Sequence, residues 1–290
     1  MKIKSFRDSI NEDEFVLFRD YIKDICGIVI PPEKAYLIET KLTMLMIESG
    51  ADSFGEFYEL LASDADPKLP EKIINAITTN ETLWFRDGTP WKVLEQTILP
   101  KCVEDILSGR KQSIRIWFAG VSTGQEAYST AMFIDDYLKK NRIQGVSLSD
   151  FDMLGTDIST HVLDSARSGR YDKISIIRGL SDYYRDNYFK ENGSAWDIDP
   201  VIKNAVKFKQ FNMKDSFLGI GKQDIVFCRY ILIYFSNEMK KDISEKIYNA
   251  LTPGGVLFTG NYVLYDIFNE KYESDHYENL TYYTKKGENQ

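Results

Sequence analysis

Residues from which proteins build disulfides and metal sites are scarce in this sequence. The three cysteines, Cys26, Cys102 and Cys228, stand far apart, so neither a disulfide framework nor a cysteine-based zinc site is expected. The two histidines, His161 and His276, are isolated as well. A zinc site needs roughly three or four ligands close together. The sequence therefore predicts no metal site.

Long apolar runs and an excess of positive charge are also missing. No segment approaches the roughly 20 apolar residues that span a bilayer, and the N-terminus shows no apolar signal core. Lys and Arg number 36 against 44 Asp and Glu, a net charge of −8. Broad affinity for nucleic acid or anionic membranes is not expected at this charge. These absences favour a cytoplasmic protein that neither inserts into a membrane nor binds nucleic acid.

Three common nucleotide and nucleophile motifs are absent too. The chain contains no G-x-x-x-x-G-K-[ST] phosphate loop, no G-x-S-x-G nucleophile elbow and no G-x-G-x-x-G dinucleotide fingerprint. The composition does support a well-packed fold, because 43% of the residues are hydrophobic and 13% are aromatic.

The hydrophobic pattern divides the chain into two modules. Residues 1–77 place apolar side chains at helical spacing, as in Phe18 and Ile22, and Gly27 is well placed to end that helix. This pattern predicts a small N-terminal helical domain. Residues 78–112 are expected to link it to the second module and to contribute to the site there.

In the second module, residues 113–290, short apolar runs alternate with helical patterns. We expect strands at 114–119, 151–156, 206–211, 224–228 and 255–260, helices at 125–140, 160–168 and near 237–251, and a last edge strand at 278–284. Such alternation predicts a doubly wound, mostly parallel sheet with helices on both faces. Residues 175–205 are rich in aromatic side chains, interrupt the alternation and indicate a packed insertion.

Two positions in the second module favour a nucleoside-bearing ligand. The first strand runs into Gly120-Val-Ser-Thr-Gly124, where small residues let a ligand approach the backbone and the next helix offers free N–H groups. The second strand ends at Asp157, which can accept hydrogen bonds from both ribose hydroxyls. Two structural alternatives remain. The glycines could serve simply to form a tight turn. Asp157 could cap the next helix, although Ser159 or Thr160 could do this equally well.

Five blocks in chain order resemble the CheR chemotaxis-receptor glutamate methyltransferases. Residues 78–86, T-T-N-E-T-L-W-F-R, are similar to the family's T-T-N-x-T-x-F-F-R. Residues 116–129 resemble its cofactor loop, I-W-S-A-x-C-S-T-G-E-E-P-Y-S, and residues 155–159, G-T-D-I-S, its second-strand motif. Residues 211–213 correspond to F-x-N-L. Residues 224–235 are similar to D-I-I-F-C-R-N-V-L-I-Y-F.

This resemblance covers residues 12–265 and implies an α/β fold of the Rossmann-like class I methyltransferase type. It further implies an all-helical N-terminal domain, a small antiparallel β-subdomain inserted at 175–205, and S-adenosylmethionine (SAM) as cofactor, with S-adenosylhomocysteine as product. The implied reaction is methyl ester formation on glutamate side chains in the cytoplasmic domain of a chemoreceptor. The implied cofactor contacts are Asn80, Thr82, Arg86, Glu126, Asp157, Asn212, Met213, Cys228 and Arg229. Arg86 and Tyr234 would lie nearest the transferred methyl group, as the catalytic residues.

Elementary chemistry agrees with this reaction. A carboxylate is already ionised at neutral pH, so its attack on a sulfonium methyl needs no general base. The enzyme has to align oxygen, carbon and sulfur and to exclude water. Arg86 can clamp a carboxylate bidentately, either the acceptor's or the cofactor's own, and Tyr234 can direct a hydroxyl into the site.

The sequence departs from the family pattern at several positions. Tyr230 replaces the usual Asn after Cys-Arg, and Val121 and Ala127 replace Cys and Pro in the cofactor loop. The second helix, 34–49, lacks the row of arginines with which relatives are expected to dock an acidic receptor segment. Residues 1–75 carry nine basic and fifteen acidic side chains, a net charge of −6.

Because complementary charge guides the choice of partner, these departures put the usual acceptor in question. Apolar contacts of Met44 and Met46 are the expected substitute for charge. Two alternatives stay open. One is a family methyltransferase redirected to another acceptor, and the other is a SAM-binding signalling module with little catalysis.

Overall fold

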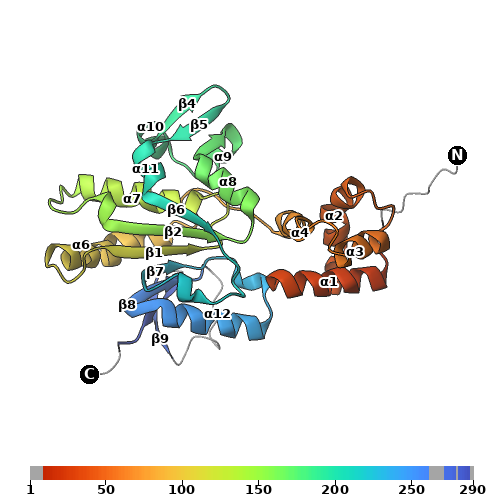
Figure 1. The fold of residues 1–290 in the computed structure, drawn as a ribbon. Coiled ribbons are helices and arrows are strands. Elements are labelled where there is room, and N and C mark those ends of the chain that lie inside the picture. Colours follow the sequence, from red (N-terminus) through yellow and green to blue (C-terminus); the bar gives the residue numbers. More distant parts are fainter. Residues whose placement is uncertain (1–8, 261–270, 279, 288–290) are drawn as a thin grey trace.

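The computed structural model describes residues 9–260, 271–278 and 280–287. Figure 1 shows a bundle of helices beside a larger module built on a sheet, with a small third unit projecting from that module. Within the described residues no helix is long and apolar enough to cross a membrane.

The N-terminal module is helical, as the apolar spacing predicts, with α1 (Glu12–Cys26), α2 (Tyr36–Glu48), α3 (Phe54–Ala62) and α4 (Leu69–Ile77). Asn11 and Glu14 form a capping box at the start of α1. Gly27 ends this helix with φ of 78°, a left-handed conformation that suits glycine. Phe18 lies at the centre of the core, where its ring stacks on that of Phe57 with centroids 5.4 Å apart.

The second module is a seven-stranded sheet in the order β6-β2-β1-β7-β8-β10-β9. Its strands are β1 (Ile114–Ala119), β2 (Phe151–Asp157), β6 (Val206–Gln210), β7 (Gln223–Phe227), β8 (Leu251–Phe258), β9 (Tyr272–Tyr277) and β10 (Leu280–Lys285). The five strands from β6 to β8 are parallel to one another, whereas β10 pairs antiparallel with both β8 and β9. The helices are α5 (Thr89–Val93), α6 (Leu99–Leu107), α7 (Gln125–Lys140), α8 (Thr160–Ser168), α11 (Pro200–Ala205) and α12 (Asn237–Ala250).

Side chains of β1 show why helices cover both faces of the sheet. Ile116 and Phe118 pack into a core that includes side chains from α6 and α7. Trp117 and Ala119 point the other way, into a core that includes Ile243 of α12. A strand that is buried on both faces reads as a continuous apolar run, which is the signal in the sequence.

Two expectations need correction. The strand expected at the edge of the sheet is β10, which lies between β8 and β9; β9 forms the edge. Its sequence, YESDHY, is too polar to stand out as a strand. Much of the segment 78–112 is not a linker, because α5, α6 and a π-helical turn between them (Leu94–Ile98) pack on the sheet.

The insertion is a three-stranded antiparallel sheet in the order β3-β5-β4. Its elements are β3 (Arg170–Asp172), α9 (Lys173–Ile177), α10 (Asp182–Tyr188), β4 (Phe189–Asn192) and β5 (Ala195–Ile198), so it begins a few residues before the expected 175. The hydroxyl of Tyr183 donates to Asp136 at 2.6 Å, and that of Tyr188 donates to Asp135 at 2.7 Å. Both acceptors lie on α7, so the tyrosines dock the insertion on the sheet module.

Packing around β2 leaves no room for a side chain at Gly155. A Cβ atom there would lie 2.9 Å from the ring of Phe208 and 3.0 Å from Val121. We expect Gly155→Val to lower the free energy of unfolding by about 1–3 kcal/mol, as overpacking does. Gly219→Ala is the control, since a Cβ there meets only the Lys209 amine at 3.7 Å. Urea denaturation measures both, and equal stability of the two variants would contradict the prediction.

Candidate active site

A cavity of about 780 Å³ lies between the helical module and the carboxyl ends of β1, β2 and β7. Open parallel sheets bind ligands at this edge, and small-molecule sites have volumes of roughly 300–1,000 Å³. The residues expected at the site that line this cavity are Asn80, Thr82, Arg86, Glu126, Asp157, Asn212, Met213, Arg229 and Tyr234. Cys228 does not line it.

One side of the cavity is closed by the chain that follows α1. The backbone N–H of Val29 donates to the carbonyl of Tyr234 at 2.8 Å. The side-chain amide of Asn212 donates to the carbonyl of Ile25 at 2.7 Å. Apolar side chains from this segment, including Ile30, form the wall that faces the sheet module. The helical module therefore supplies part of the cavity itself.

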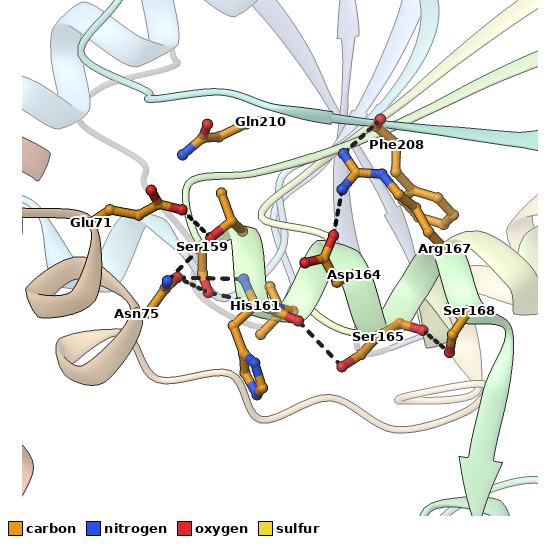
Figure 2. Close-up of polar contacts among 12 residues, drawn as sticks. Glu71, Asn75, Ser159, His161, Asp164, Ser165, Arg167, Ser168, Phe208 and Gln210 are labelled. Atoms are coloured by element: carbon orange, nitrogen blue, oxygen red, sulfur yellow. Dashed lines mark hydrogen bonds and ion pairs between the residues drawn. The ribbon is translucent and has the colours of Figure 1, made fainter. Parts of the chain in front are cut away.

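Helix α4 contacts the start of α8, and Figure 2 shows the polar contacts between them. Ser159, at the start of α8, donates to Asn75 at 2.7 Å. The amide of Asn75 donates in turn to Thr160 at 3.1 Å, and Thr160 donates to Glu71. Two groups of polar contacts beside the cavity thus join the modules.

Asp157 ends β2 and is 9% exposed. Its Oδ2 accepts from the backbone N–H of Ser122 at 2.9 Å, and its Oδ1 accepts from that of Ser159 at 3.0 Å. Burial raises the pKa of the Asp157 carboxyl, and these N–H groups oppose the rise. Ser159 provides the side-chain cap of α8, so the capping alternative falls to Ser159. Asp157 instead connects the turn after β1 to the turn after β2, and its carboxylate has further lone pairs that can accept from a ligand.

The turn after β1 brings backbone close to the cavity. Gly120 has φ of 68°, and a Cβ atom there would lie 2.4 Å from Ile231. Ser122 also adopts a left-handed conformation, with φ of 52°. Its hydroxyl donates to the carbonyl of Asn80 at 2.8 Å. The turn therefore needs its glycine and is more than a simple reversal of the chain.

Arg229 forms a buried ion-pair network at the end of β7. Its side chain is 1% exposed and pairs with Glu126, at the start of α7, and with Asp87 at 2.5 Å. It also donates to the carbonyl of Arg86 at 3.0 Å. A buried guanidinium requires such partners because leaving it unpaired is strongly unfavourable. Arg229 and Glu126 thus hold the backbone around Arg86, besides lining the cavity.

Residues 78–86 form a strap along the cavity. The ammonium of Lys41 donates to the carbonyl of Thr78 at 2.8 Å and so fixes the beginning of the strap. Trp84 is fully buried, and its indole N–H donates to the carbonyl of Ser175 in the insertion at 3.0 Å. The strap is therefore fastened to the helical module at one end and to the insertion near the other.

Two residues next to Arg86 have unusual backbone angles. Phe85 has φ of 48° and Asp87 has φ of 75°. Non-glycine residues in this region are uncommon and concentrate at functional sites. Between them, the Arg86 guanidinium lies 3.7 Å from the ring centroid of Tyr230. The strained backbone thus aims Arg86 at the cavity.

Three of the expected cofactor contacts have side chains that contact other parts of the protein. The Cys228 side chain is fully buried in the core below the cavity, and burial raises the pKa of its thiol. The amide of Asn212 is used on backbone, since its oxygen also accepts from the N–H of Lys214 at 3.1 Å. Met213 is 8% exposed and packs in the same core as Cys228.

Sequence reasoning assigned no contact within the site to four residues that shape it. Ser122 lies inside a matched block and Asp87 directly follows one, so their positions in the sequence already indicated the site. Tyr230 stood out as a departure, but its contact with Arg86 was not foreseen. Lys41 gave no signal, because the pattern of a helix does not show that its ammonium reaches the end of another helix.

Comparison with known proteins places both modules in one family. The family model of the CheR methyltransferase SAM-binding domain matches residues 80–274, and that of the CheR all-alpha domain matches residues 13–78. Their junction falls at the strap.

Several curated relatives match most of the chain. Chemotaxis protein methyltransferase Cher2 of Pseudomonas putida is 40% identical over 248 residues, which is 85% of this chain and 88% of that protein. Chemotaxis protein methyltransferase 1 of Pseudomonas aeruginosa is 41% identical over the same shares of both chains. The chemotaxis protein methyltransferase of Vibrio parahaemolyticus is 35% identical over 87% of this chain and 89% of that protein. With both domain models matched in order, the chain belongs to the CheR methyltransferase family.

Proposed function

We propose that this protein transfers the methyl group of SAM to glutamate side chains of a chemoreceptor and forms methyl esters there. The observation that carries this proposal is that a buried carboxylate and a cation from the strap line the same cavity. These groups are Asp157 and Arg86. The relatives are named chemotaxis protein methyltransferases, which supplies the class of reaction and acceptor.

The residues around the cavity fit SAM. Asp157 offers carboxylate lone pairs beside the turn that carries Gly120, which suits the two hydroxyls of a ribose. The cavity volume of about 780 Å³ leaves room for an acceptor side chain as well. SAM, when bound, supplies an electrophilic methyl group on a sulfonium sulfur.

The residues of this chain mainly have to position the reacting groups. No histidine lines the cavity in the part of the chain that the structure describes. None is needed, because a glutamate carboxylate is ionised at neutral pH and is itself the nucleophile. Arg86, unlike Arg229, has no carboxylate among its described partners, so its charge can orient the carboxylate of the acceptor. Tyr234 presents its side chain at the same cavity and can direct a hydroxyl toward the acceptor.

The surface expected to meet the acceptor, helix α2, is not basic. Lys41 is the one basic residue of α2, and its ammonium is held by the carbonyls of Ile77 and Thr78. Met44 is 64% exposed, and Tyr36 is exposed eight residues before it on the same side of the helix. Met46, expected in the contact, is fully buried in the helical core, so that expectation is wrong. We propose that the receptor helix meets α2 through apolar contacts.

Arg86→Ala tests the catalytic assignment. With radiolabelled SAM and receptor-containing membranes, we expect the wild type to produce base-labile methyl esters on the receptor. The variant should lose about 10²- to 10³-fold in rate, because the acceptor carboxylate loses its charged partner. Arg115→Ala, a change to an exposed residue of β1, is the control and should keep nearly full activity. Unchanged activity of Arg86→Ala would remove Arg86 from the mechanism.

The same assay distinguishes the proposed function from the two alternatives. Label on proteins other than receptors would replace the chemoreceptor with another acceptor. Cofactor binding without transfer to any tested acceptor would favour a SAM-binding signalling module. Both outcomes contradict the proposal.

Asp157→Asn tests the cofactor site. We expect the Kd of S-adenosylhomocysteine, measured by calorimetry, to rise by about 10-fold or more, because a charged acceptor is replaced and one backbone N–H loses its partner. Asp152→Asn, at the other end of β2, is the control. Because the pKa of Asp157 is raised, binding should weaken as the pH falls toward that pKa and protonates the carboxylate. Binding that stays constant in this range would contradict the assignment.

Met44→Glu tests the docking face. An added charge on an apolar contact should raise the KM for receptor by about 10-fold while the Kd of S-adenosylhomocysteine stays unchanged. Leu218→Glu is a matched control, since Leu218 is 92% exposed and lies outside α2. If both variants behave like the wild type, α2 does not meet the receptor through Met44.

A further inference from the structure

Tyr230 holds a backbone conformation that its side chain does not favour. Its φ is 61°, in the left-handed region, where a bulky residue is strained. The family usually has Asn at this position, and Asn tolerates the left-handed region. A tyrosine here therefore needs contacts that offset the strain.

The ring of Tyr230 provides such contacts. The guanidinium of Arg86 lies 3.7 Å from the ring centroid, a close cation–π arrangement. Gly260 leaves space for the ring, because a Cβ atom there would lie 3.0 Å from Cζ of Tyr230. An asparagine could offer no such surface to Arg86.

The hydroxyl of Tyr230 acts on the charge next to Arg86. It donates to Oδ2 of Asp87, the same oxygen that accepts from Arg229 at 2.5 Å. Asp87 is the chain neighbour of Arg86 and the nearest carboxylate in sequence that could neutralise it. Because Arg229 and the Tyr230 hydroxyl both donate to this carboxylate, it pairs with Arg229 and not with Arg86. The nearest polar partner left to Arg86 is the carbonyl of Glu81, at a long 3.5 Å.

We propose that Tyr230 is a positioning residue for Arg86. Its ring fixes the plane of the guanidinium, and its hydroxyl keeps Asp87 away from that cation, so that Arg86 presents an unneutralised N–H edge to the carboxylate it clamps. This inference rests on the proposed function. It gives the tyrosine that stands here in place of the family's usual Asn a role in positioning Arg86.

A double-mutant cycle tests the proposal. Tyr230→Phe keeps the ring and loses the hydroxyl, whereas Tyr230→Leu loses both. We expect Tyr230→Leu to lower kcat/KM by about 2- to 30-fold, the range that a cation–π contact corresponds to, and Tyr230→Phe to lose less. In the Arg86→Ala background neither change should lower the residual rate further. Equal losses in both backgrounds, or equal losses for Phe and Leu, would overturn the proposal.

Tyr230→Asn separates positioning from a structural role. Asn relieves the strain, so the variant should be at least as stable as the wild type in urea, yet lose activity as Tyr230→Leu does. Wild-type activity in this variant would overturn the proposal, as would an activity loss that follows a loss of stability.

A spectroscopic measurement keeps the result separate from the proposed function. In protein labelled with ¹⁵N-arginine, the Nε–H signal of Arg86 should be shifted upfield by the aromatic ring in the wild type and in Tyr230→Phe, but not in Tyr230→Leu. If no acceptor is methylated, the proposed function fails while this shift still supports the contact. If the shift is the same in all three proteins, Tyr230 does not hold Arg86 even if methylation occurs.

Discussion

The guanidinium of Arg229 lies in a place where a single charge could not stay without partners. Its side chain is 1% exposed, and a buried cation is tolerated only when carboxylates and hydrogen bonds surround it. Glu126 supplies one carboxylate from the start of α7, and Asp87 supplies the other from the end of the strap. Since Arg229 itself follows β7, three distant segments have to meet at this point. The rest of the site is arranged around that meeting.

Backbone strain gathers where these segments converge. Phe85, Asp87, Ser122 and Tyr230 are non-glycine residues with φ between 48° and 75°, and each lies at the cavity or next to a residue that lines it. Such conformations persist only where neighbouring contacts fix them. The contacts are present: Phe85 donates its backbone N–H to Ser129 at 3.1 Å, and Asp87 is held by Arg229. The ion pairs and the strain therefore belong to one arrangement, which directs Arg86 into the cavity.

Much of this could be predicted from sequence, for a physical reason. A helix such as α7 or a buried strand such as β1 has a period that is visible in the chain, and both begin and end where expected. Cys228 shows where the reasoning stopped short. Successive side chains of an extended segment face opposite sides, so Cys228 enters the core while its neighbour Arg229 turns to the cavity. A matched block names both residues but does not say which one faces the ligand.

What sequence could not show is how the strap depends on contacts far away in the chain. Lys41 of α2 holds its first carbonyl, Ser122 of the turn after β1 holds Asn80, and the insertion holds Trp84 through Ser175. No periodicity encodes these contacts, because each joins a side chain to a backbone carbonyl that carries no residue-specific signal. Since Arg86 follows Trp84 by two residues, its position depends on all three parts of the molecule. Partly buried hydrogen bonds of 2.8–3.0 Å from α2, from the turn after β1 and to the insertion therefore fix the course of the strap that carries Arg86.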